Sequence, residues 1–414
     1  MTFNLLLRHL IRRGTLRVID PQGRVRVFAG KPGPVITIRL HDQQVLRQLT
    51  LNPRLHLGES YMDGRLTVED GGSLYDFLDL VATNMNLAPQ SLLTPIYNGF
   101  GTTLRAIQQW NKVGRSRRNV AHHYDLSDTL YDLFLDRDRQ YSCAYFTAPD
   151  QAIDQAQANK KRHIAAKLLL KPGQRVLDIG CGWGGLALYL AKECEVEVTG
   201  LTLSVEQLRV AERRAAAAGL ANRVRFKLLD YRQEEGVYDR IVSVGMFEHV
   251  GVPQYRTFFR KVKGLLKDDG VALLHSIGRA DGPGATNPWI RKYIFPGGYS
   301  PALSEVLPKV ERAGLWVTDI EVLRLHYAET LKAWRTRFMA ERERIKQLYD
   351  ERFCRMWEFY LAGSEIAFRH QGHIVFQMQL ARQVDAVPLT RDYMFDWERS
   401  HQAPKPAEKS GRAA

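Results

Sequence analysis

Four side chains that could take part in catalysis lie in short, mostly apolar segments of the sequence. Cys143 lies in YSCAYF, Glu248 and His249 lie in MFEHVG, and His275 lies in LHSIG. A thiol can act as a nucleophile or a metal ligand, and carboxyl and imidazole groups are common general acids and bases. Each also has a structural interpretation: Cys143 and His275 as packed core residues, and Glu248 as an acid at a helix N-terminus. Taken singly, these residues leave both interpretations open.

A glycine-rich segment, VLDIGCGWGGLALYLA at 176–191, is the sharpest motif in the chain. An apolar strand ends there, and the helix that follows is opened by Gly180, Gly182, Gly184 and Gly185. Glycine permits positive φ and lets a ligand approach the backbone closely. The spacing differs from the dinucleotide motif GxGxxG, and the Lys-Ser/Thr ending of a phosphate-binding P-loop is missing. The segment resembles the S-adenosylmethionine (SAM) loop of class I methyltransferases.

Two later strand ends carry polar residues that suit the same ligand. In TGLTLSVEQL, Thr202 stands where many enzymes of this class place an acid for the ribose, and Leu203 and Gln207 follow it. In LLDYRQ, Tyr231 and Arg232 follow the next strand, where the adenine usually lies. Both segments also have a plain interpretation as polar strand ends, which are common in any α/β fold.

The elements that must position these residues alternate between strand and helix from about residue 120 onward. This alternation predicts an α/β fold with a parallel, Rossmann-like sheet of the class I SAM-dependent methyltransferase type. Residues 1–110 are predicted to form a small α+β accessory domain, with a hairpin in TLRVIDPQGRVRVFAG, a strand in VITIRL and an amphipathic helix in SLYDFLDLVATNM. The predicted boundaries are a basic linker at 111–121, a catalytic domain at 122–400 and a disordered tail at 401–414.

The composition narrows the possible partners and the location. The chain has 414 residues and a formal net charge of +14, which favours anionic partners: nucleic acid, lipid surface or acidic substrate. VGMFEHVG stands where nucleic-acid base methyltransferases carry an Asn/Asp-Pro-Pro-aromatic motif, which argues against nucleic acid. Four scattered cysteines without a CxxC pair argue against a disulfide framework and a thiolate metal site. With no signal peptide and no spanning segment in the sequence, we expect a cytoplasmic protein peripheral to the inner face of the membrane.

Residues 120–400 carry a dense set of motifs that resemble the cyclopropane-fatty-acyl-phospholipid synthases and the mycolic-acid cyclopropane synthases. The motifs are HYDLSDTLYDLFLD, YSCAYF, LDIGCGWGG, GLTLS, MFEHVG, NPWIRKYIFPGGYSP, HYAETLKAW and RMWEFYLAGSEIAFR. The N-terminal segment resembles the extra domain of the phospholipid enzymes, which is involved in dimer formation. The resemblance implies a homodimer that transfers a methylene group from SAM to the cis double bond of an unsaturated acyl chain in a membrane phospholipid.

The resemblance also implies the site residues. It predicts a bound bicarbonate as the base, contacted by Cys143, Glu248, His275, Ile277 through its backbone, and Tyr327, with His249 in a supporting role. It predicts SAM contacts from Tyr141, Ser142, Gly180, Gly182, Thr202, Leu203, Gln207, Tyr231 and Arg232. It implies no metal. The aromatic residues of WIRKYIFPGGY and WEFY are expected to line the acyl site, and the basic segment LKAWRTRFMAERERIK to face phospholipid.

The implied chemistry suggests a role for the thiol of Cys143. An alkene that attacks a sulfonium methyl needs alignment and dryness rather than an activating base, and it leaves a carbocation that aromatic faces can stabilise. A thiolate would trap that cation or react with SAM. Cys143 has no neighbouring Lys or Arg in the sequence to lower its pKa, so we expect a neutral wall residue.

Three alternatives remain at this stage. The same alkene could give a methyl-branched or methylene product. The chain could be a membrane-binding protein with a degenerate methyltransferase fold. On charge alone, a nucleic-acid methyltransferase is also possible.

Overall fold

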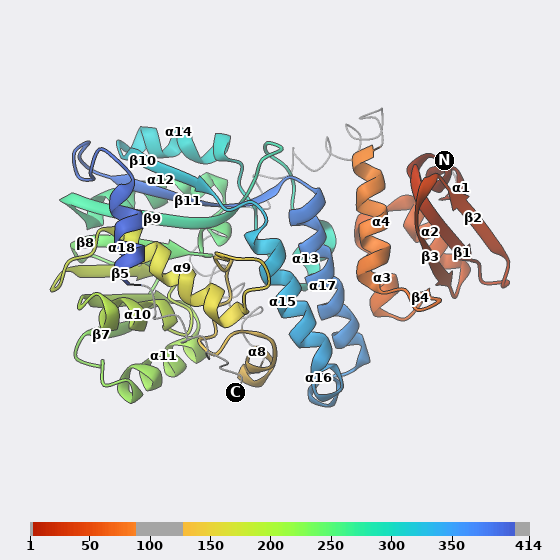
Figure 1. The fold of residues 1–414 in the computed structure, drawn as a ribbon, viewed down its shortest axis with the longest axis horizontal. Helices are drawn as coiled ribbons and strands as arrows, with labels where there is room; N and C mark the ends of the chain where they lie inside the picture. Colours follow the sequence, from red (N-terminus) through yellow and green to blue (C-terminus); the bar gives the residue numbers. More distant parts are fainter. Residues whose placement is uncertain (1–2, 88–126, 402–414) are drawn as a thin grey trace, which may run out of the picture.

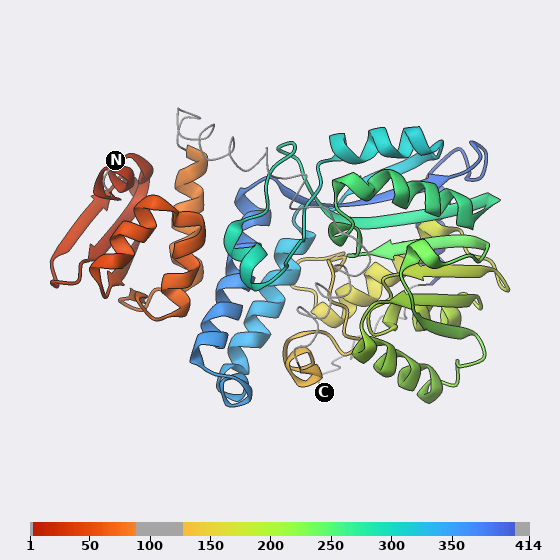
Figure 2. The same ribbon diagram turned by 180° about the vertical axis from the view of Figure 1, so that it is seen from behind.

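The computed structural model describes residues 3–87 and 127–401. It has a small N-terminal domain on one side and a large α/β domain on the other, with a pair of long helices between them (Figures 1 and 2). The basic linker predicted at 111–121 and nearly all of the tail predicted at 401–414 lie outside the described residues. Within the described ranges, none of the helices has the length and apolar character needed to cross a bilayer.

The N-terminal domain is a four-stranded sheet covered by helices. In chain order its elements are α1 (Phe3–Leu10), β1 (Arg13–Ile19), β2 (Val25–Ala29), β3 (Lys31–Leu40), α2 (Gln43–Leu51), α3 (Pro53–Met62), β4 (Leu66–Glu69) and α4 (Leu74–Leu87). The sheet order is β2-β1-β3-β4, and β1 pairs antiparallel with β2, which confirms the predicted hairpin. The predicted strand and amphipathic helix correspond to β3 and α4.

The large domain is built on a seven-stranded sheet with the order β10-β11-β9-β8-β5-β6-β7. Its strands are β5 (Arg175–Ile179), β6 (Glu197–Thr202), β7 (Val224–Leu228), β8 (Tyr238–Val244), β9 (Leu266–Arg279), β10 (Trp316–Val322) and β11 (His373–Ala381). The strands from β7 to β9 run parallel, whereas β11 is antiparallel to both of its neighbours. The parallel α/β prediction is therefore confirmed, with one reversed strand near the edge.

Helices cover both faces of this sheet because alternate strand residues are apolar on both sides. Val176 and Val242 pack under α9 (Ile153–Leu168) and α10 (Gly185–Glu193). Leu177 and Ile241 pack under α12 (Tyr255–Leu265) and α14 (Leu303–Ala313) on the other face.

Apart from the two long helices described next, the remaining helices of the domain are α8 (Asp128–Phe134), α11 (Val205–Ala217), α13 (Pro288–Tyr293), α16 (Arg342–Leu348), α18 (Asp392–Ser400) and the short turns η1 (Tyr231–Gln233), η2 (Phe247–His249) and η3 (Val252–Gln254).

The two long helices between the domains are α15 (His326–Ala340) and α17 (Glu351–His370) (Figure 1). Trp357 and Tyr360 of α17 belong to an aromatic cluster inside the large domain. Ala362 and Ile366 of the same helix belong to the core of the N-terminal domain. Tyr61 of α3 also donates a hydrogen bond to Glu358 at 2.8 Å. The helix α17 is therefore shared by both hydrophobic interiors.

The basic segment LKAWRTRFMAERERIK, at 331–346, forms the C-terminal part of α15 and most of α16. Five of its six Lys and Arg side chains lie in ion pairs with acidic residues of the same chain. Arg337, for example, pairs with Asp154 of α9. Most of the positive charge on this segment is thus compensated within the protein, which sequence reasoning did not foresee.

Candidate active site

The glycine-rich loop joins β5 to α10 and leaves space for a ligand against its backbone. Gly180 has φ +87° and Gly182 has φ +54°, in the left-handed region that favours glycine. A Cβ on Gly180 would lie 2.7 Å from the side chain of Met246, whereas one on Gly182 would meet nothing within 4 Å. Gly180 is therefore required for packing, and Gly182 borders open space.

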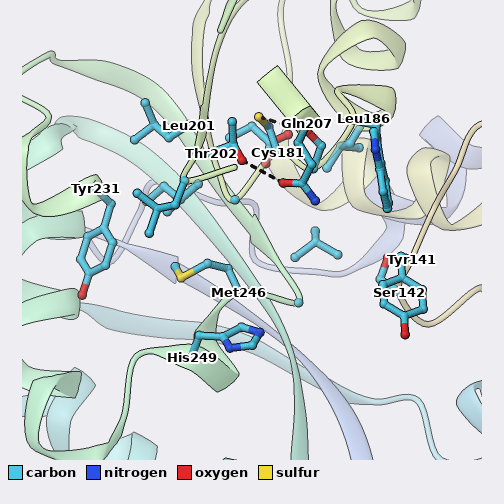
Figure 3. Close-up of a pocket in the computed structure, with 18 of the residues that line it drawn as sticks. Tyr141, Ser142, Cys181, Leu186, Leu201, Thr202, Gln207, Tyr231, Met246 and His249 are labelled. Carbon is cyan, nitrogen blue, oxygen red and sulfur yellow. Dashed lines mark hydrogen bonds between the residues drawn. The ribbon is translucent and has the colours of Figure 1, made fainter. Parts of the chain in front are cut away.

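A cavity lies at the carboxyl ends of β5, β6, β7 and β8, where the chain order in the sheet reverses (Figure 3). Open α/β sheets bind their ligands at this place. All nine residues predicted to contact SAM line this cavity: Tyr141, Ser142, Gly180, Gly182, Thr202, Leu203, Gln207, Tyr231 and Arg232. The structure thus brings together segments that are up to 91 positions apart in the sequence.

At the end of β6, the position expected for an acidic ribose ligand is occupied by a neutral hydrogen-bonded pair. The Thr202 hydroxyl donates to Gln207 Oε1 at 2.8 Å (Figure 3). Gln207 lies in the first turn of α11, where its backbone N–H donates to Oγ of the N-cap Ser204 at 3.3 Å. Because its oxygen is engaged by Thr202, the Gln207 amide presents its nitrogen as a donor.

The third strand end is braced by an ion pair. Arg232 donates to both oxygens of the buried Asp230, from Nε at 2.8 Å and from Nη2 at 2.7 Å. The guanidinium carbon also lies 5.6 Å from the centroid of the Tyr231 ring. Asp230 therefore holds Arg232 at the wall of the cavity, next to the aromatic ring predicted near the adenine.

A buried cation that sequence reasoning missed lies next to the cavity residue Ser142. Lys160 of α9 is completely buried and donates from Nζ to Ser142 Oγ at 2.6 Å. Burial lowers the pKa of Lys160 to about 8, although the charge of Asp136 opposes this shift. Nothing in QANKKRHIAAK distinguishes Lys160 from its neighbour Lys161, because only the rotation of the helix decides which of them faces the site.

Asp178, at the end of β5, is a second cavity residue that was not predicted as a ligand contact. Its side chain is 1% exposed, and Oδ2 has no hydrogen-bond partner among the described residues. Burial raises the pKa of Asp178 to about 7, with the charge of Lys160 acting in the opposite direction. A buried carboxyl oxygen at a cavity wall requires a donor, which a ligand carrying an ammonium group can supply.

The predicted anion site is centred on Glu248 and Ile277. Glu248 Oε1 accepts a hydrogen bond from the Ile277 backbone N–H at 2.7 Å. Glu248 Oε2 is buried and has no partner among the described residues. Burial raises the pKa of Glu248 to about 7, so the carboxyl is poised to hold or release a proton near neutral pH.

Cys143 and Tyr327 belong to the buried aromatic cluster, and Ile277 packs against that cluster. The Cys143 thiol donates to the Ala144 carbonyl at 3.3 Å. Burial raises the pKa of Cys143 far above its usual range, and the nearby charge of Lys160 does not reverse this. The thiol is therefore neutral, as the prediction for Cys143 requires, and its place in the wall of the reaction site remains a prediction.

Two histidines border the site, and both are neutral. Burial lowers the pKa of His249, which lines the cavity, to about 4. Burial and the charges of Lys160 and Lys167 hold the pKa of His275 well below its usual value. His275 Nδ1 lies 3.2 Å from Gln377 Nε2. This contact could not be predicted from the sequence, because Gln377 lies 102 positions away on β11.

The five predicted anion-site residues do not themselves line the cavity; they lie directly behind it. Cys143 follows Ser142, and Glu248 precedes His249, and both neighbours are cavity residues. The aromatic segments predicted for the acyl site also converge here. The buried cluster includes Trp289, Tyr327, Trp334, Trp357 and Tyr360. The arrangement is a nucleoside-type cavity that adjoins an aromatic interior with one proton-holding carboxyl group.

Comparison with known proteins identifies the family. Residues 111–378 match the model for mycolic acid cyclopropane synthetase. The chain is 38% identical over 352 residues to the cyclopropane-fatty-acyl-phospholipid synthase of Escherichia coli, covering 84% of this chain and 88% of that protein. It is 37% identical to a probable fatty acid methyltransferase of Pseudomonas putida, covering 88% and 92%.

The solved structure of the mycolic acid cyclopropane synthase CmaA1 complexed with SAH and CTAB has a TM-score of 0.61 at 35% identity. The structural match covers 64% of this chain and 97% of the CmaA1 chain. The resemblance seen in the sequence motifs is thus confirmed by both sequence and fold. The chain belongs to the cyclopropane synthase family, and it is a SAM-dependent methyltransferase.

Proposed function

We propose that this protein transfers a methylene group from SAM to the cis double bond of an unsaturated acyl chain in a phospholipid, forming a cyclopropane ring. The proposal rests on Oε2 of Glu248, a buried oxygen with no partner among the described residues. Glu248 is next to His249, which lines the same cavity as all nine predicted SAM residues. The name of the E. coli relative supports a phospholipid acyl chain as the acceptor.

The cavity fits SAM in two ways. Gly182 leaves open space for the ligand against the loop. Asp178 Oδ2 has no partner among the described residues and could accept a hydrogen bond from the ammonium group of SAM. When bound, SAM supplies an electrophilic methyl group on a sulfonium. Tyr141, Ser142 and Gln207 would orient it, and the aromatic cluster would keep water away from the reacting centre.

The alkene π electrons form a bond to the methyl carbon while the carbon–sulfur bond breaks and its electrons stay on sulfur. The acyl chain then carries a positive charge, which the faces of buried aromatic residues stabilise. Loss of one proton from the added methyl group leaves the electron pair that closes the three-membered ring. The neutral thiol of Cys143 is a poor trap for the cation.

Bicarbonate, when bound, would supply the base that takes this proton. The carboxyl of Glu248 fits such an anion: the Ile277 N–H holds Oε1, and Oε2 has no partner in the described chain. In its ionised form, Glu248 would accept a hydrogen bond from the O–H of bicarbonate. With a pKa of about 7, it could then take up that proton after bicarbonate has accepted the proton lost by the methyl group. His275, Cys143 and Tyr327 would complete the site.

A second product is possible from the same site. Loss of a different proton from the cation, directly or after a hydride shift, gives a methylene chain or a methyl-branched chain that retains a double bond, instead of a ring. The similarity to a probable fatty acid methyltransferase over most of both chains favours keeping this alternative. Cyclopropane and methylene products have the same mass, so only a method that observes the ring protons distinguishes them.

We further infer that the protein acts on an anionic membrane surface, at the inner face of the cell membrane, as a homodimer. The net charge of +14 supports attraction to anionic lipid. The sequence resemblance of the N-terminal segment to the dimer-forming domain of the phospholipid enzymes supports the dimer. Neither inference requires nucleic acid as a partner.

The test is to incubate the purified protein with SAM and vesicles of a cis-monounsaturated phospholipid containing anionic lipid, followed by mass spectrometry and proton NMR of the acyl chains. A gain of one CH₂ with upfield cyclopropyl signals supports the proposal. A gain in mass without those signals supports the second product. Unmodified chains from protein that binds SAM would overturn both.

A further inference from the structure

A row of three polar side chains crosses the sheet behind the active site. His275 on β9 pairs directly with Gln377 on β11, and Gln377 pairs directly with Glu321 on β10. Residues directly opposite one another on neighbouring strands project from the same face. This face is the one covered by α9, which places Lys167 and His163 over the row.

Lys167 determines the orientation of the Gln377 amide. The buried Lys167 ammonium donates to Gln377 Oε1 at 2.7 Å and also to Glu321 Oε2. An ammonium group has donors and no acceptor, so the amide atom that faces it must be the oxygen. The reversed amide would place two donors against each other in a buried site, which costs the amide its hydrogen bond.

The orientation of Gln377 in turn determines which nitrogen of His275 carries the proton. With its oxygen on Lys167, Gln377 directs Nε2 at His275 Nδ1, 3.2 Å away. An amide nitrogen only donates, so Nδ1 must be the unprotonated acceptor. A neutral imidazole has one N–H, which then lies on Nε2. Nε2 itself has no hydrogen-bond partner within the described ranges.

We propose that Lys167 and Gln377 are positioning residues that hold His275 as its Nε2–H tautomer, so that a neutral N–H donor faces the anion site of the proposed reaction. The inference rests on the proposed function for the identity of what Nε2–H faces. The tautomer itself follows from the contacts alone. A neutral donor can hold an anionic base in place without giving up a proton to it, which keeps the base available for the cation on the acyl chain.

The row is anchored at its outer end by further charged contacts. His163 Nε2 lies 2.7 Å from Glu321 Oε2, and His163 Nδ1 lies 2.5 Å from Glu398 of α18. In Figure 1, α18 lies across α9 near the C-terminal end of the described chain. These contacts hold Glu321 in place, and Glu321 in turn holds the Lys167 ammonium over Gln377.

The decisive measurement is the tautomer of His275 in the intact wild-type protein, read by ¹⁵N NMR of protein labelled at histidine. A His275→Asn variant, which lacks the signal, assigns it. We expect an N–H at Nε2 and an unprotonated Nδ1. A proton on Nδ1 in the wild-type protein would overturn the inference without any further variant.

Two substitutions then test the cause. Gln377→Glu retains shape and can still pair with Lys167, but its second oxygen is an acceptor, which requires an N–H at Nδ1 and should move the tautomer to Nδ1–H. Turnover should then fall by about 10²-fold, as for loss of one donor in an anion site. Lys167→Met should leave Gln377 free to reverse and give both tautomers. An unchanged tautomer in folded Gln377→Glu would contradict the inference.

Gln379→Glu is the matched control. Gln379 is a buried glutamine two positions along β11 on the same face, but it pairs opposite Leu273 and donates to the Lys167 carbonyl at 2.5 Å. We expect it to retain the Nε2–H tautomer whatever its effect on stability. The NMR measurement requires neither lipid nor turnover. Unmodified vesicles together with an Nε2–H tautomer would therefore count against the proposed function and in favour of the positioning role.

Discussion

Lys160 Nζ donates to Ser142 Oγ across 2.6 Å, and this contact joins the helix α9 to the wall of the cavity in which we expect SAM to bind. The lysine is buried among Asp136, Asp178 and Cys143, and its charge acts on all three. The Lys160 side chain therefore positions Ser142 and supplies a positive charge beside the cavity.

Replacing Lys160 with Met should weaken SAM binding by about tenfold, since a hydrogen bond to a charged group contributes roughly 1.5–3 kcal/mol. Isothermal titration calorimetry measures this directly. Lys192→Met is the control, because Lys192 is an exposed residue of α10 whose only described pairing is with the adjacent Glu193. Equal affinity in the two variants would show that Ser142 does not need Lys160.

Gly182→Ala should abolish most SAM binding while the protein still folds. The new methyl group meets no protein atom within 4 Å, so it occupies the space assigned to the ligand. Gly173→Ala is a closely matched control: its φ is +77° and its surroundings are also open, but it does not line the cavity. Both variants carry a similar backbone strain of about 1 kcal/mol, so their melting temperatures should fall by similar amounts. In isothermal titration calorimetry, only Gly182→Ala should lose affinity for SAM.

Glu248→Gln should reduce turnover on phospholipid vesicles by about 10²-fold or more, since a positioned acid or base contributes roughly that factor. The amide oxygen can still accept from the Ile277 N–H, so the local fold is retained. SAM affinity should stay within about twofold, because Glu248 does not line the cavity. A variant with full activity would remove Glu248 from the reaction.

Glu248 should also leave a signature in the pH dependence of stability. Its pKa is raised from 4.5 in the unfolded chain to about 7 in the folded protein. The stabilisation is therefore fully present below pH 4.5 and is lost as the pH rises to about 7. The unfolding free energy of the wild type relative to Glu248→Gln should fall by about 3 kcal/mol over this interval, since one pKa unit corresponds to about 1.4 kcal/mol. Chemical denaturation at pH 4.5, 5.5 and 7 gives the difference. Parallel curves would mean that the carboxyl is not held protonated.

The sheet and the glycine loop could be predicted from the sequence because both depend on local patterns. The strand segment has apolar residues on both faces, and the glycines that follow permit the positive φ that a tight turn requires. Seven of the nine cavity residues lie at the ends of β5, β6 and β7 or in the segments that follow them, whereas Tyr141 and Ser142 rest on the resemblance of YSCAYF. Lys160 and Gln377 could not be chosen from local patterns, because their roles arise from the rotation of α9 and from pairing across the sheet. Asp178 stands at a strand end in the glycine motif, but its unpartnered oxygen is visible only in the structure. The SAM contacts, the five residues of the anion site and the domain boundaries remain predictions.

The sharing of α17 between two interiors has a consequence for how the protein loses its structure. The hydroxyl groups of Tyr360 in this helix and of the cavity residue Tyr141 form a hydrogen bond at 2.8 Å. Ile366, less than two turns further along the helix, belongs to the N-terminal core. Removing the first domain would uncover that apolar stripe and loosen a wall of the cavity. We therefore expect the two domains to melt together in one cooperative transition, and a ligand bound in the cavity to raise the melting temperature of both.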